Sequence, residues 1–63
     1  MKNKYLLPVS EASKVYGIGR DKFYQLIRSQ KDIPIIKIGG ATKINSILFE
    51  EWLNKCTREG RAL

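Results

Sequence analysis

The chain has 63 residues, which is enough for one domain and too few for a second. Twelve Lys and Arg residues against six Asp and Glu residues give a net charge of +6, which favours a polyanionic partner such as nucleic acid. The sequence has no histidine and one cysteine, Cys56, so it predicts no zinc site, no internal disulfide and no His-dependent active site. A single free thiol is typical of the reducing cytoplasm. Neither a signal peptide nor a run of about 20 apolar residues is evident.

The N-terminal part predicts a short arm followed by a helix. Residues 1–8 form the arm, which Pro8 ends. Ser10 is a favourable N-cap for a helix over residues 10–16, and the apolar positions of this helix recur at helical spacing. Gly17 is expected to end the helix in the left-handed conformation, and residues 17–19 then make a tight turn.

A second helix is predicted over residues 20–30, with Gly19 as a weak cap. Its inward face consists of Phe23, Leu26 and Ile27, and the opposite face is polar and basic. The outward-facing residues are Arg20, Asp21, Tyr24, Gln25 and Arg28.

The next segment predicts a β-hairpin. Residues 33–38 are rich in β-branched side chains, Gly39-Gly40 marks a turn, and residues 42–45 return. A two-residue loop would pair Ile36 with Lys43, whereas a three-residue loop over residues 39–41 would pair Ile36 with Ile44 and Lys37 with Lys43. We favour the three-residue loop because it buries the apolar set. The residues sent to the core would be Ile36, Ile38, Thr42 and Ile44.

A third helix is predicted to begin at a cap formed by Asn45 or Ser46. Gly60 lies beyond its end, and residues 58–63 are expected to form a flexible tail. The apolar stripe of this third helix is expected to join the core, with Trp52 as a structural residue and Cys56 as a small buried residue. The predicted core residues are Phe23, Ile27, Ile36, Ile38, Phe49, Trp52, Leu53 and Cys56.

The order helix, tight turn, helix, hairpin, helix is a DNA-binding arrangement. Residues 9–14, 16–20 and 23–28 resemble the helix-turn-helix of the excisionase family. Residues 33–40 resemble the first wing strand and turn of that family, and residues 44–53 resemble its closing strand and helix.

The resemblance implies an α+β fold, a small winged helix-turn-helix similar to the mercury-resistance regulators. Excisionases of temperate phages and conjugative transposons bind and bend attachment-site DNA and direct a tyrosine integrase toward excision. Residues 11–14 with Ile18-Gly19 resemble the conjugative-transposon members in particular. The chain departs from the family pattern at Gly19, where Ser or Thr is usual, and at Ala41 and Thr42, where arginine and an aromatic residue are common. These departures predict a weaker helix start and a weaker wing contact.

The candidate DNA contacts lie on the second helix and the wing. Arg20, Tyr24 and Arg28 form one stripe, and arginine can donate two hydrogen bonds to guanine. Lys37 and Lys43, predicted to lie opposite each other, would hold phosphate, and the start of the first helix would hold another. The alternative is that these are ordinary solvated side chains, edge-strand lysines and a plain cap. The predicted set is Ser10, Arg20, Asp21, Lys22, Tyr24, Gln25, Arg28, Lys37, Gly39, Gly40, Thr42 and Lys43.

Other functions remain open at this point. A transcriptional regulator of a phage or mobile element would use the same surface, and an adaptor for an acidic protein would use the same charge. The sequence shows no catalytic set, no cofactor motif, and no long amphipathic helix for a membrane surface. The expected partners are double-stranded DNA, a tyrosine integrase, and further copies of the chain bound cooperatively, because one small module binds DNA weakly.

Overall fold

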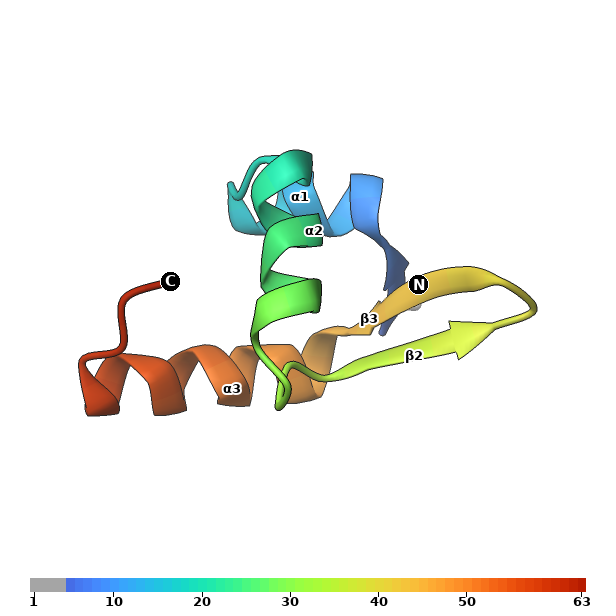
Figure 1. Ribbon diagram of the computed structural model, residues 1–63. Coiled ribbons are helices and arrows are strands. Elements are labelled where there is room, and N and C mark those ends of the chain that lie inside the picture. Colours follow the sequence, from blue (N-terminus) through green and yellow to red (C-terminus); the bar gives the residue numbers. More distant parts are fainter. Residues whose placement is uncertain (1–4) are drawn as a thin grey trace.

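The computed structural model describes residues 5–63, so residues 1–4 of the predicted arm lie outside the described residues. The described part contains three helices and a three-stranded antiparallel sheet with the strand order β1-β3-β2 (Figure 1). This is the predicted α+β winged helix-turn-helix. In chain order the elements are β1 (Leu6–Pro8), α1 (Val9–Tyr16), α2 (Arg20–Ser29), β2 (Ile35–Ile38), β3 (Ala41–Asn45) and α3 (Ser46–Glu59).

The start of α1 differs from the prediction. The N-cap is Pro8, and Ser10 lies within the first turn and makes no capping hydrogen bond, so the predicted Ser10 cap is wrong. The cause is β1, which the sequence analysis missed because three residues are too few for a periodic signal. Pairing of Pro8 with Lys43 keeps the chain extended up to the proline, and the helix begins immediately after it.

The tight turn between α1 and α2 follows the prediction. Gly17 has a φ of 67° and ends α1, and its N–H donates to the carbonyl of Ser13. A side chain at this φ would be strained, which is why glycine suits the position. Gly19 precedes α2 as its N-cap.

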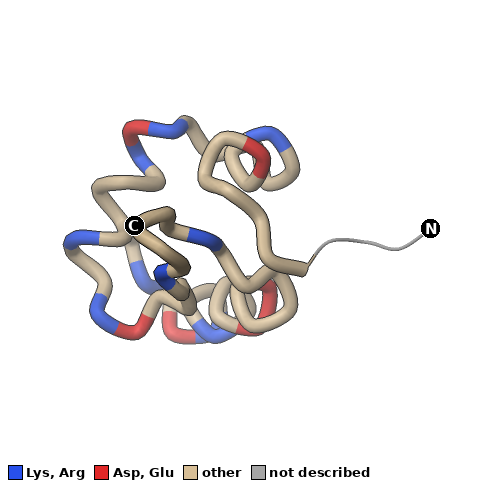
Figure 2. The backbone as a smooth tube through the Cα atoms, turned by 90° about the vertical axis from the view of Figure 1, so that its right-hand side faces the viewer, with Lys and Arg blue, Asp and Glu red and all other residues tan. Residues whose placement is uncertain are grey.

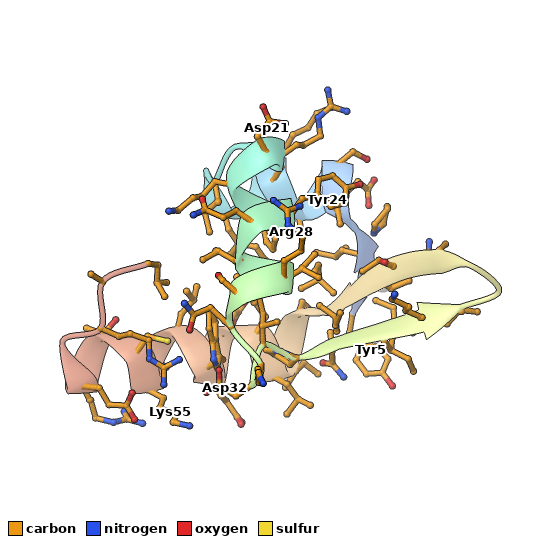
Figure 3. All side chains as sticks on the ribbon, in the orientation of Figure 1. Tyr5, Asp21, Tyr24, Arg28, Asp32 and Lys55 are labelled. Carbon is orange, nitrogen blue, oxygen red and sulfur yellow. The ribbon has the colours of Figure 1, made fainter. Side chains whose placement is uncertain are left out.

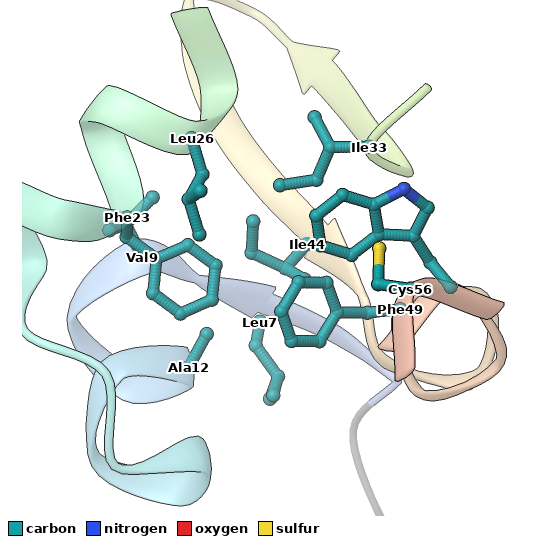
Figure 4. Close-up of a cluster of buried hydrophobic side chains, with 10 residues drawn as sticks. Leu7, Val9, Ala12, Phe23, Leu26, Ile33, Ile44, Phe49 and Cys56 are labelled. Atoms are coloured by element: carbon teal, nitrogen blue, oxygen red, sulfur yellow. The ribbon is translucent and has the colours of Figure 1, made fainter. Parts of the chain in front are cut away.

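The core gathers one face of each helix around the sheet (Figure 4). Phe49 lies at its centre, with its ring centroid 5.3 Å from that of Phe23 and 5.6 Å from that of Trp52. Ile44 of β3 is fully buried beside them, and Cys56 is a buried free thiol, as predicted. The buried residues are Leu7, Val9, Ala12, Phe23, Leu26, Ile33, Ile44, Phe49, Trp52 and Cys56.

The register of the hairpin is the main correction. The turn has two residues, so Ile36 pairs with Lys43 and Lys37 pairs with Thr42. The predicted pairing of Lys37 with Lys43 is therefore wrong. Ile36 and Ile38, predicted to be core residues, are 46% and 48% exposed.

The physical reason for this register lies in the turn. Gly39 and Gly40 have φ values of 57° and 93°, so both central residues occupy the positive-φ region that a two-residue hairpin turn of type I′ requires. Glycine adopts this conformation without steric cost. The register then pairs Ile35 with Ile44 on the core side, so one isoleucine of β2 is partly buried against the core.

Residues 58–63, predicted to form a flexible tail, begin within α3 and make contacts through Arg61. The side chain of Asn45 accepts a hydrogen bond from the N–H of Leu48 and caps α3, which continues to Glu59. Arg61 then folds back, donates to Gln30 at 3.2 Å, and lies 5.9 Å from the centre of the Trp52 ring. The residues after Glu59 therefore cover one side of the core.

Candidate nucleic-acid interface

The outer face of α2 carries the predicted contact residues. Tyr24 and Arg28 project from this helix away from the core (Figure 3), and Tyr24 is 48% exposed. Asp21 lies at the first turn of the helix, where a carboxylate interacts favourably with the helix dipole. Arg20, Asp21, Tyr24, Gln25 and Arg28 are exposed, and Lys22 is half-buried.

A groove separates α2 from the hairpin. Arg20 and Tyr24 line one wall, and residues 40–42 of the turn and β3 line the other. The floor is formed by residues 8–10, where β1 passes into α1. The groove therefore joins three of the predicted segments, namely the start of α1, the exposed face of α2 and the wing.

Thr42 of β3 lies opposite the start of α1. The N–H of Ser46 donates to the carbonyl of Tyr5 at 2.7 Å, and backbone directions alternate along a strand, so Ile44 and Thr42 direct their backbone groups toward β1 and the residue that follows it. In this register Thr42 faces Val9, the first residue of α1, which also lines the groove. The backbone of Thr42 thus lies beside the start of α1.

The structure does not bring all predicted residues to the groove. Ser10, Arg20, Tyr24, Gly40 and Thr42 line it. The two predicted wing lysines, Lys37 and Lys43, do not line the groove themselves. Lys43 is adjacent to Thr42 and pairs with Pro8, which also lines the groove, whereas Lys37 lies on β2, the strand farther from it.

Sequence reasoning missed three lining residues, Pro8, Val9 and Ala41. They carry no charge or hydrogen-bonding side chain, so their type gave no signal. Their place follows from β1, since pairing with β3 brings the start of α1 next to the wing. Recognising β1 would have been the one way to find them.

The charges are distributed unevenly over the fold. The hairpin segment, residues 33–45, contains two lysines and no acidic residue. Three of the six acidic residues lie on α3, where Figure 2 shows acidic and basic positions interleaved along the lower part of the trace. Positive charge without acidic neighbours is therefore a property of the hairpin, while α3 is mixed.

On the side of the molecule away from the groove, acidic and basic groups form a network around Asp32. Its carboxylate accepts from Arg61 at 3.2 Å and from Lys55 at 3.2 Å, and Arg61 also pairs with Glu59 at 2.7 Å. The Arg61 guanidinium, above all, lowers the pKa of Asp32. The indole N–H of Trp52 contributes to this lowering, although its geometry falls short of a full hydrogen bond. The pKa of Arg61 is raised in turn, mainly by Asp32.

A second contact joins α1 to α3. The hydroxyl of Tyr16 donates to the carboxylate of Glu50 at 3.0 Å, and the Tyr16 ring lies 4.9 Å from that of Phe49. Burial raises the pKa of Tyr16, and the neighbouring Glu50 adds to the effect. Both networks lie away from the groove, so they support the fold and leave the face of α2 free.

The comparison with family models decides the kind of domain. A model described as a helix-turn-helix domain matches residues 6–57, which includes the other five elements in full and all of α3 except its last two residues. The chain belongs to this helix-turn-helix family. A helix-turn-helix domain is a DNA-binding unit, so DNA is the partner that the fold, the match and the charge support together. Neither the comparison with curated proteins nor that with solved structures gives a match.

Among residues 5–63, no helix is both long enough and apolar enough to span a membrane. These residues also contain no group of three metal-binding side chains.

Proposed function

We propose that this helix-turn-helix protein binds double-stranded DNA with α2 in the major groove and the hairpin beside it. The observation that carries the proposal is the groove, which sets Arg20 and Tyr24 of α2 opposite residues 40–42. A duplex presents a phosphate strand between its major and minor grooves. That strand would lie in the protein groove while α2 reads base edges.

The proposed contacts divide by chemistry. Arg20 and Arg28 would read bases, because an arginine can donate two hydrogen bonds to guanine. The side chain of Lys43 and the first turn of α1 at Ser10 would hold phosphates. Lys37 is left out of this set because it lies on the outer strand, opposite Thr42, and does not itself line the groove.

We infer further that the protein acts as an excisionase, which binds and bends attachment-site DNA and directs a tyrosine integrase toward excision. The resemblance of its segments to that family supports this role. In this role the protein positions DNA and does no chemistry itself. A single module of about 600–1,000 Å² of interface binds weakly, so copies at neighbouring sites would bind together.

An excision assay with a tyrosine integrase and its attachment-site DNA tests this role. The integrase should release the element in the presence of the protein and fail without it, and a footprint should cover repeated sites beside the crossover site. Equal excision with and without the protein would contradict the role. If the protein then bound a promoter and changed its transcription, the regulator, which shares the same DNA-binding surface, would be the function.

A further inference from the structure

The outer strand of the hairpin has an open edge. The strand order places β2 at one end of the sheet. The carbonyl of Pro34 accepts from the N–H of Asn45 at 3.3 Å, so even-numbered residues here direct their backbone groups toward β3. Because the direction alternates along a strand, the N–H and C=O groups of Ile35 and Lys37 point away from the sheet.

This edge carries exposed apolar side chains. Ile36 and Ile38 are about half exposed and lie on the face of the sheet opposite the buried Ile44. An open edge with apolar side chains is a template for pairing with another strand. The β2 edge lies on the side of the hairpin away from β1. Ile36 shares its face of the sheet with Lys43, with which it pairs, and Lys37 pairs with Thr42 of the groove.

We propose that the edge of β2 binds an extended segment of another protein, which adds to the sheet as a fourth strand. The segment alternates apolar and acidic residues. Its apolar side chains cover Ile36 and Ile38, and an acidic side chain lies opposite Lys37, on the other face. This inference goes beyond the DNA-binding function and does not rest on it.

The charge of the hairpin indicates which kind of segment can pair with β2. The hairpin segment has two lysines and no acidic residue, so an acidic segment complements it. A second copy of the chain does not: the antiparallel pairing of two β2 strands that sets Ile36 against Ile38 also sets Lys37 directly opposite Lys37. Like charges directly opposite destabilise a sheet. Lys37 thus disfavours the self-pairing register that aligns Ile36 with Ile38, and it favours an acidic partner.

The test uses two short synthetic peptides, one alternating valine with glutamate and the other valine with lysine. They are titrated into the isotope-labelled full chain without DNA, and binding is read from amide NMR shifts. We expect the glutamate peptide to shift the amides of residues 35–38 and to slow hydrogen exchange at Ile35 and Lys37. The lysine peptide should leave both unchanged. In the variant Lys37→Glu the preference should reverse, so that the lysine peptide binds.

A second pair of variants separates the backbone from the charge. Lys37→Pro removes an N–H that points away from β3 and leaves the β2–β3 ladder intact, so it should abolish binding. Lys37→Thr removes the same charge and keeps the N–H, so it should retain part of the binding. Unchanged shifts at Ile44 confirm the fold, and the reversal in Lys37→Glu remains decisive if the proline variant does not fold.

Three results would overturn the proposal. Equal binding of both peptides would remove the role of charge. Concentration-dependent shifts at residues 35–38 in the chain alone, with dimer formation in sedimentation, would assign the edge to a second copy. A loss of DNA affinity in Ile38→Thr, without peptide binding in the unaltered chain, would assign this face to DNA.

Discussion

Helix α2 and the hairpin both contribute to the same groove, yet they are specified in different ways. In α2 the apolar residues Phe23 and Leu26 are buried and the charged residues are exposed, as helical periodicity dictates. In the hairpin Ile36 and Ile38 are exposed, although they are as apolar as the buried Ile44. Periodicity therefore decides the orientation of the helix, whereas the two-glycine turn decides the register of the hairpin.

The largest expected effect tests this register directly. Ile44→Ala should lower the free energy of unfolding by about 2–5 kcal/mol, because it leaves a cavity in the core. Ile38→Ala should cost far less, because its side chain is already half exposed. Urea denaturation followed by circular dichroism measures both. Equal losses would mean that Ile38 is buried and that the hairpin has the other register.

The next effect concerns the binding face of α2. Arg20→Ala or Arg28→Ala should each weaken binding to a selected duplex by about 1–3 kcal/mol and relax the preference at one base pair. Arg58→Ala is the matched control, because Arg58 is an exposed arginine on α3, outside the groove. Fluorescence anisotropy against a set of single-base variants measures both properties. An effect of Arg58→Ala as large as the other two would move the interface to α3.

A smaller effect tests the role of the turn. Gly40→Ala should cost about 1–2 kcal/mol of folding stability, because its φ of 93° is unfavourable for any side chain. Gly39→Asn is the control: its φ of 57° lies in the left-handed region, which asparagine tolerates at this turn position. Thermal or urea unfolding distinguishes them. If both substitutions were neutral, the turn would not be what fixes the register.

The wing should contribute to affinity without contributing to sequence preference. Lys43→Ala should weaken binding to all duplexes alike and reduce the slope of log K against log salt by about 1, the value for one phosphate contact. Lys37→Ala should change the slope less, since Lys37 lies on the outer strand. Anisotropy over a range of salt concentrations gives both slopes, and a larger change for Lys37 would reverse the assignment of the two lysines.

The smallest expected effect concerns Asp32, which lies in neither α2 nor the hairpin. The lowered pKa of Asp32 means that its carboxylate stabilises the fold above the ordinary aspartate pKa of about 3.9, and this contribution is lost as the pH falls below that value. Asp32→Asn should therefore reduce the melting temperature at neutral pH and weaken its fall in acid. Gln25→Asn, at an exposed and uncharged residue of α2, serves as the control and should not change the acid dependence. An unchanged acid dependence in Asp32→Asn would contradict the role of the Arg61 contact.

Much of the fold and part of the candidate site could be predicted from the sequence. Helical periodicity predicted the apolar stripe of α3 that includes Phe49 and Trp52. The conformational freedom of glycine predicted that Gly17 ends α1 in the left-handed conformation. The strand β1 could not be predicted, because it exists only through pairing with β3. The fold-back of Arg61 onto Asp32 was equally out of reach, because the two residues are far apart in the chain.

The candidate site shows the same division. The exposure of Arg20 and Tyr24 followed from the helix period, but the groove that faces them depends on β1 and on the two-residue turn. The errors at Ser10 and in the pairing of Lys37 arose from these two features. Local patterns thus identified the residues of the site, and long-range pairing determined which of them lie together.

The central claim is that DNA occupies the groove between α2 and the hairpin. The most direct test is an amide NMR titration of the full chain with a duplex that contains a selected site. The account predicts shifts at Ser10, along residues 20–28 and at residues 40–43, with residues 54–59 of α3 unaffected. Shifts concentrated on α3, with α2 and the turn unchanged, would contradict it.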